Sequence, residues 1–173
     1  MIDLETLGTT SDSVILSIGA VRFDENGIDD NAFYCSVSID SNLAAGRKIS
    51  EDTLIWWMNQ SKEAQKVFNE PKIVLSEALY ALRDFMPQDN DCLVWSNGAD
   101  FDIPMLTHAF KQMDIEVPWK FYNVRCYRTM KALAPHVKVP RLGVHHDALA
   151  DAVYQASHLV AIHQQLRAAP KAA

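Results

Sequence analysis

Two carboxylates, Asp3 and Glu5, lie two residues apart at the start of this sequence. If their segment is a strand that runs into a turn at Gly8, both acids point to one face, and Ile2 and Leu4 point to the other. Like charges this close repel and raise each other's pKa unless a cation lies between them. The pair therefore predicts a site for a hard metal ion with oxygen ligands, although two surface acids at a strand end would give the same short pattern.

Further acids and two histidines could complete such a site. Asp102 lies at the start of a predicted helix, where an Asp also commonly caps the helix. Asp147 and Asp151 lie one turn apart on the last predicted helix, so they share a face. The place of Asp147 at the helix start favours capping, whereas Asp151 can face a cleft. His145 and His146 immediately precede this last predicted helix, and either is a candidate proton acceptor.

These residue types suit the hydrolysis of a phosphodiester. In-line attack needs a water nucleophile, a proton acceptor and charge stabilisation on the entering and leaving oxygens, which two cations about 4 Å apart provide. Mg²⁺ takes oxygen ligands and keeps some of its waters, so carboxylates completed by substrate and water fit this chemistry. A histidine has a reference pKa near neutrality and can accept the proton of the water.

Composition limits the class of protein. The length of 173 residues and the hydrophobic content of 49% suit a single domain over residues 1–173, with about 168–173 as a frayed tail. Because the sequence has no run of about 18 apolar residues and no signal-peptide pattern, we expect a soluble cytoplasmic protein with no membrane partner. Cys35, Cys92 and Cys126 show no CxxC spacing, so they indicate neither a disulfide framework nor a zinc site.

The charge balance bears on the substrate. The formal net charge is −6, which argues against indiscriminate binding to duplex nucleic acid, because a basic stripe supplies most of that affinity. A phosphate substrate bridged by metal remains compatible with this charge. Bound cations would offset several of the acids, and a single-stranded end needs few phosphate contacts.

The elements that must position these residues follow from turn signals and periodicity. After the first strand, two more are expected over Val14–Phe23 and Ala32–Ile39, joined by a hairpin with Asn26–Gly27 at its tip. Helices are expected to start near Ser50 and Ser61 and to cover Ser76–Met86, Ile103–Met113, Tyr127–Leu133 and Asp147–Arg167. Two further strands are expected over Cys92–Trp95 and Phe121–Val124. A basic loop that carries Lys138 and Arg141 is expected over His136–Val144.

This order predicts an α/β fold of ribonuclease H-like type, a mixed five-stranded sheet with helices on both faces. In such an order the first and fourth strands lie side by side. The end of the strand with Asp3 and Glu5 is then expected to meet the loop that leads to Asp102.

Three motifs in register carry a family resemblance: Asp3-x-Glu5, Asn97-x(3)-Phe101-Asp102 and His146-x(4)-Asp151. Together they resemble the DEDDh branch of the 3′-5′ exonucleases. The pair Trp56-Trp57 followed by Gln60, and the phrase Trp95-Ser-Asn-Gly98, resemble the small 3′-5′ exoribonuclease group that includes phage exonucleases. The resemblance implies a ribonuclease H-like fold, two divalent cations (Mg²⁺ or Mn²⁺) held by Asp3, Glu5, Asp102 and Asp151, and His146 as the general base.

The resemblance also implies contacts with the substrate. Trp56 and Trp57 are adjacent on a helix and cannot share one face, so we expect one in the core and the other stacked on a base. Arg128 lies in the segment Arg125-Cys-Tyr-Arg128, which resembles a family segment that often has an acid at the position of Cys126. Arg128 is a candidate to bind a phosphate of the substrate or to form a structural contact. The full set of expected contacts is Thr6, Leu7, Gly8, Trp56, Trp57, Gln60, Asn97, Phe101 and Arg128.

The expected activity is that of a metal-dependent 3′-5′ exonuclease, which releases nucleoside monophosphates from single-stranded nucleic acid 3′ ends. RNA is favoured over DNA by the resemblance to the exoribonuclease group. Two alternatives remain open: a DNA exonuclease with the same mechanism, and a non-catalytic module of the same fold that binds nucleic acid. A homodimer is also compatible with the resemblance, since related small exonucleases are often dimers.

Overall fold

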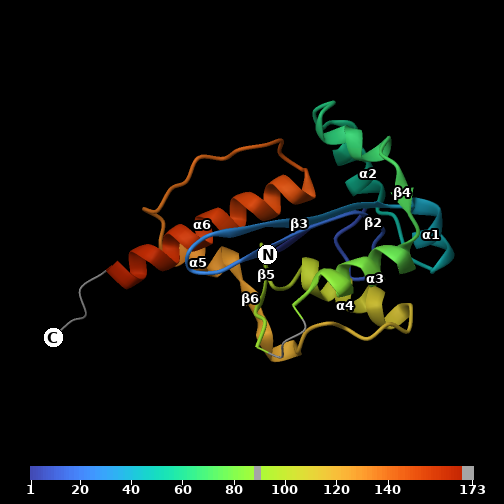
Figure 1. Ribbon diagram of the computed structural model, residues 1–173. Coiled ribbons are helices and arrows are strands. Elements are labelled where there is room, and N and C mark those ends of the chain that lie inside the picture. Colours follow the sequence, from blue (N-terminus) through green and yellow to red (C-terminus); the bar gives the residue numbers. More distant parts are fainter. Residues whose placement is uncertain (88–90, 169–173) are drawn as a thin grey trace.

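The strands of the computed structural model, which describes residues 1–87 and 91–168, form two sheets (Figure 1). Within these residues, β1 (Ile2–Thr6), β2 (Ile15–Phe23), β3 (Ile28–Val37) and β4 (Lys72–Ile73) form a mixed sheet in this order. Strands β1 and β3 are both antiparallel to β2, which lies between them, and β4 is parallel to β3. A separate parallel pair consists of β5 (Val94–Ser96) and β6 (Val124–Cys126).

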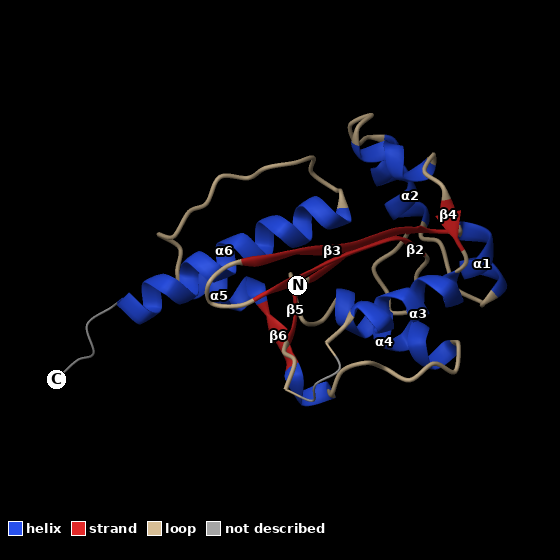
Figure 2. Cartoon of the chain, in the orientation of Figure 1, coloured by secondary structure: helices blue, strands red, loops and turns tan. Residues whose placement is uncertain are grey.

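Helices lie on both sides of the larger sheet (Figure 2), as predicted. Helix α6 runs along one side of β1, β2 and β3, whereas α3 and α4 lie on the other side. The helices are α1 (Ile39–Ala44), α2 (Glu51–Met58), α3 (Leu75–Phe85), α4 (Asp102–Gln112), α5 (Tyr127–Leu133) and α6 (Ala148–Ala168), with two 3₁₀ turns, η1 (Ala64–Phe68) and η2 (Phe121–Asn123).

The single five-stranded sheet is not confirmed. Strand β5 lies beside β1 as expected, but the two belong to different sheets. In the middle of β1, the backbone N–H of Leu4 donates to Oδ1 of Asp102 at 3.1 Å. A side chain from α4 thus takes a backbone donor that a neighbouring strand would otherwise use.

The alternation predicted for β1 is confirmed by the two cores around it. Ile2 and Leu4 pack on the side of α3 and α4, with residues such as Leu79 and Phe110. The other side, which carries Asp3 and Glu5, is covered by α6, whose Ala152 and Ala156 are fully buried. The acids of β1 therefore face α6 rather than the main apolar core.

Gly19 of β2 allows α6 to approach the sheet this closely. It pairs with Asp3 across the β1–β2 ladder. A Cβ atom at Gly19 would lie 2.3 Å from the backbone carbonyl carbon of Ala148 and 2.4 Å from the backbone nitrogen of Leu149. The first turn of α6 thus rests directly on the backbone of β2, beside the acids of β1.

Several element boundaries differ from the sequence-based expectation. The strand expected over Phe121–Val124 is wrong for its first residues, which form η2, and β6 begins at Val124. Strand β3 ends at Val37, because the Ser38 hydroxyl accepts a hydrogen bond from the Ser41 backbone and starts α1. The segment after Ser61 is a 3₁₀ turn, and β4 was not expected. Apart from residue 168, the expected tail lies outside the described residues.

Candidate active site

Three side chains from separate parts of the chain meet where β1 ends. One ligand atom each from Glu5, His146 and Asp151 lies within 4.8 Å of the others. Glu5 comes from β1, Asp151 from the first turn of α6, and His146 from the loop before it. Together with Asp3 and Asp102 we call this group the cation site.

Asp3 and Glu5 are buried carboxylates with acidic neighbours. Burial is the largest cause of the raised pKa of Asp3, and the charges of Asp102 and Glu5 raise it further. Burial also raises the pKa of Glu5 to about 8, with Asp102 and Asp147 adding to the effect. Without a bound cation these acids would therefore retain protons, which is the behaviour expected of carboxylates placed to share positive charge.

Asp102 reaches the site from α4. The sequence placed it at the cap of this helix, but Phe101 is the cap residue and Asp102 is the first helical residue, with its carboxylate accepting from Leu4 of β1. It is 3% exposed, and burial raises its pKa to about 7, although the Leu4 N–H and the charge of Arg128 act in the opposite direction. The carboxylate thus joins α4 to the strand that carries the other acids.

His146 has an unusual backbone conformation. Its φ is +63°, in the left-handed region that few residues other than glycine adopt, and such conformations recur at functional sites. Its N–H donates to Oδ2 of Asp151 at 3.3 Å, and its ring lies edge-on to Trp56 with centroids 4.8 Å apart. Burial lowers the pKa of His146, helped by His145 and Arg141, so the neutral, proton-accepting imidazole is favoured.

The structure distinguishes between neighbouring candidates at the start of α6. Asp147 Oδ1 accepts from the backbone N–H of Ala150 at 2.8 Å, so Asp147 caps the helix. Asp151, one turn later, belongs to the group with Glu5 and His146. His145 is exposed and lies outside that group. This arrangement agrees with the spacing on which the family resemblance rests.

Two residues at the site were missed by the sequence analysis. Gln155 Nε2 donates to Oδ1 of Asp3 at 2.7 Å. The Arg141 guanidinium forms an ion pair with Asp151 Oδ1, and its Cζ lies 4.9 Å from the centroid of the Tyr154 ring. Only the one-turn spacing of Gln155 from Asp151 was available as a signal, and Arg141 was recognised merely as part of a basic loop.

A cavity of ≈ 380 Å³, which we call the substrate cavity, opens beside Glu5. The two tryptophans of α2 have different roles there. Trp57 is 1% exposed and its Nε1 donates to the backbone oxygen of Thr6 at 2.8 Å, whereas Trp56 is 41% exposed and lies beside His146. The lining consists of Leu4, Glu5, Thr6, Gly8, Thr9, Asp52, Thr53, Trp56, Trp57 and Phe101.

Four of the expected substrate contacts do not line this cavity. The Leu7 side chain is buried in an apolar cluster with Val14, Leu16 and Trp57. Gln60 Nε2 donates back to the Trp56 carbonyl at 3.1 Å at the end of α2. Among the remaining two, Asn97 accepts through its backbone oxygen from Arg128 Nη2 at 3.0 Å.

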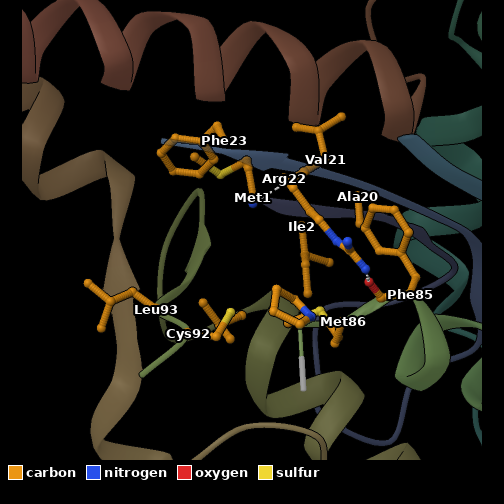
Figure 3. A pocket seen from close by; sticks show the side chains of 12 residues that line it. Met1, Ile2, Ala20, Val21, Arg22, Phe23, Phe85, Met86, Cys92 and Leu93 are labelled. Atoms are coloured by element: carbon orange, nitrogen blue, oxygen red, sulfur yellow. Dashed lines mark hydrogen bonds between the residues drawn. The ribbon is translucent and has the colours of Figure 1, made fainter. Parts of the chain in front are cut away.

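A second cavity lies at the opposite end of β1 (Figure 3). It has a volume of ≈ 80 Å³ and is lined mainly by apolar side chains, including Ile2, Phe85 and Met86. Its one charged side chain among the described residues, Arg22, donates to the Phe85 backbone oxygen. Because no carboxylate is found among the described lining residues, this cavity is a poor candidate for the chemistry of the cation site.

The cation site fits a divalent metal ion by its chemistry. Its donors are mainly carboxylate oxygens, which Mg²⁺ and Mn²⁺ prefer. The acids are buried beside one another, and a shared cation would remove the repulsion and the desolvation that raise their pKa. The arrangement could therefore bind one or more divalent ions next to a cavity whose volume is usual for a small-ligand site.

Two comparisons with known proteins agree with this geometry. A family described as "3'-5' exoribonuclease Rv2179c-like domain" matches residues 1–163. A protein of Enterobacteria phage T4, named exodeoxyribonuclease, is 24% identical over 155 residues, in an alignment that covers 75% of this chain and 68% of the phage protein. Both descriptions are of exonucleases, one acting on RNA and the other on DNA.

Proposed function

The chain belongs to the Rv2179c-like 3′-5′ exoribonuclease domain family, and on this premise we propose that it removes nucleoside monophosphates from the 3′ ends of single-stranded RNA with Mg²⁺ or Mn²⁺. The observation that carries the proposal is the group of Glu5, His146 and Asp151, in which Glu5 lines the substrate cavity and His146 packs against Trp56 of the same cavity. Among the described residues, no helix is both long enough and apolar enough to cross a bilayer.

The proposed roles follow from the contacts at the site. Asp3, Glu5, Asp102 and Asp151 would hold the divalent ions, whose chemistry is to stabilise charge on the phosphate and to ease deprotonation of water. His146 accepts the proton of the attacking water, because its lowered pKa keeps the imidazole neutral. The hydrogen bond from its backbone N–H to Asp151 holds it beside a carboxylate of the same site.

The substrate cavity suits the end of a single strand. Trp56 offers a half-exposed ring beside His146 on which the terminal base can stack, and Phe101 lies on the same cavity. A volume of ≈ 380 Å³ is within the usual range for small-ligand sites. Recognition by one stacked base and the bound cations needs few phosphate contacts, in keeping with the net charge of −6.

DNA is the second candidate substrate. The family description favours RNA, whereas the phage relative is named as an exodeoxyribonuclease. The chemistry at the phosphate is the same for both, and a contact with the 2′-hydroxyl would distinguish them. The proposal places RNA first because the family match spans residues 1–163.

The test uses oligomers of one sequence, as RNA and as DNA, labelled at the 5′ end and incubated with Mg²⁺ or Mn²⁺. We expect a ladder of progressively shorter RNA products, a slower ladder from DNA, and neither in EDTA. Asp151→Asn is the matched negative control, because the amide keeps the size of the side chain but not its charge. No RNA shortening by the unaltered protein with either ion would refute the proposal.

A further inference from the structure

Gln155 lies in α6 one turn after Asp151, on the side of the helix that covers β1. The side chain is 5% exposed, which is unusual for a polar residue on a surface helix. Its Nε2 donates to Oδ1 of Asp3 at 2.7 Å. Asp151 and the amide that binds Asp3 therefore lie on the same face of one helix.

We infer that Gln155 is a positioning residue of the cation site, which fixes the carboxylate of Asp3 through Nε2 and offers its Oε1 to a water molecule bound to the cation. This inference rests on the proposed function, because it concerns the same site. Gln155 acts through Asp3 and through water, so it is not itself a catalytic residue.

Asp3 has few sources of stabilisation other than Gln155. Within the described residues, Gln155 provides the only side-chain hydrogen bond that Asp3 receives, and Asp3 forms no ion pair. Its acidic neighbours Glu5 and Asp102 repel it, and the nearby guanidinium of Arg141 is paired with Asp151 instead. The orientation of the Asp3 carboxylate therefore depends on Gln155.

The other half of the Gln155 amide, its oxygen Oε1, is free to bind a further partner at the site. When a cation is bound, Asp3 is ionised and its carboxylate only accepts hydrogen bonds, so the amide must present its nitrogen to Asp3, and the oxygen is left over. Gln155 Oε1 is buried and has no hydrogen-bond partner in the described structure. Because both amide atoms are bonded to one carbon, Oε1 also lies close to Asp3. Buried acceptors are normally satisfied, and a water polarised by a cation on Asp3 is a strong donor at that place.

The test measures Mn²⁺ binding by calorimetry and by the Mn²⁺ electron paramagnetic resonance signal. Gln155→Leu and Gln155→Met remove both the donor and the acceptor, and methionine keeps the length of the side chain. Gln165→Leu is the matched control, since Gln165 is an exposed glutamine further along α6. Melting temperatures without divalent cation report on any effect that is purely structural.

We expect the parent and Gln165→Leu to bind Mn²⁺ alike, and both Gln155 variants to bind it 10- to 100-fold more weakly, as is common when a partner of a metal ligand is removed. The Mn²⁺ concentration that gives half-maximal RNA turnover should rise by the same factor. Parent-like Mn²⁺ affinity in Gln155→Met would overturn the inference and leave the proposed function intact. A parent that binds Mn²⁺ but does not shorten RNA would instead refute the proposed function alone.

Discussion

At the scale of single residues, His146 combines a left-handed backbone, whose N–H donates to Asp151, with a ring that packs against Trp56. Such a conformation costs of order 1–3 kcal/mol and persists only where the surroundings enforce it. Here the enforcing contacts are the hydrogen bond to Asp151 and the packing on Trp56. The position of the imidazole is thus tied to the ligand helix on one side and to the substrate cavity on the other.

We expect His146→Ala to lower turnover by roughly two to four powers of ten, because it removes the proton acceptor and leaves the four carboxylates in place. Mn²⁺ affinity, measured by calorimetry, should change little. His145→Ala is the matched control, since His145 is exposed and lies outside the group of possible ligands. If His146→Ala loses Mn²⁺ binding as well, His146 is a metal ligand rather than the base.

Arg141 is the resident counter-ion of Asp151. We expect Arg141→Gln to lower the free energy of unfolding of the cation-free protein by about 1–3 kcal/mol, less than for a fully buried pair because both side chains keep some exposure. The same variant should bind Mn²⁺ more tightly, since the ion no longer competes with the guanidinium for Asp151. Chemical denaturation and calorimetry measure the two effects.

Lys138→Gln, which changes an exposed cation of the same loop, is the control for the Arg141 prediction. Both variants remove one positive charge, so a purely long-range effect would be similar in the two. Weaker Mn²⁺ binding in Arg141→Gln would contradict the prediction and indicate that Arg141 supports the cation.

At the scale of elements, the site depends on how closely α6 approaches the sheet. Gly19→Ala would place a Cβ atom 2.3 Å from the backbone of Ala148, so the first turn of α6 must shift. We expect a lower melting temperature and weaker Mn²⁺ binding, because Asp151 and Gln155 move relative to Asp3. Thermal denaturation with and without Mn²⁺ measures both.

The control for this prediction is Gly27→Ala at the hairpin tip, where a Cβ atom would have no neighbour within 4 Å. It should leave Mn²⁺ binding unchanged. A Gly19→Ala protein that melts earlier but binds Mn²⁺ with the affinity of the parent would mean that the packing of α6 is not what aligns the site.

At the scale of the whole molecule, the buried acids link stability to pH. Burial and neighbouring acids raise the pKa of Glu5 from 4.5 to about 8, so between these values the folded chain holds a proton that the unfolded chain has lost. The contribution of Glu5 to stability is therefore complete below its unfolded pKa and is lost as the pH rises toward 8. This is the reverse of ordinary acid denaturation.

We expect the free energy of unfolding of the parent, relative to Glu5→Gln, to fall as the pH rises from 5 to 8 without divalent cation, by up to about 1.4 kcal/mol per pH unit. Comparison with Glu5→Gln cancels groups whose pKa does not depend on Glu5, and the difference reports on Glu5 together with Asp3, whose pKa the charge of Glu5 raises. Mn²⁺ binding by the parent should strengthen over the same range, since bound protons must leave. Urea denaturation at several pH values checks the first effect, and a constant difference would disprove it.

The sequence alone determined which residues of β1 share a face, because the alternation of a strand depends only on local geometry. For the same reason the Ser50 helix start, the Asn26–Gly27 hairpin and the bounds of α5 and α6 were close to the observed ones. The three motifs in register also indicated the family, which the match over residues 1–163 confirms. These features are encoded in short stretches of chain.

Only the tertiary structure decided the contacts between distant segments. The Leu4–Asp102 hydrogen bond joins residues 98 positions apart, and no local pattern encodes it. Likewise, Trp57 is the buried member of its pair because its Nε1 reaches Thr6. The contact between Gln155 and Asp3 spans 152 positions, and it exists because Gly19 lets α6 rest on β2. Such pairings depend on packing between elements, which spacing along the chain does not specify.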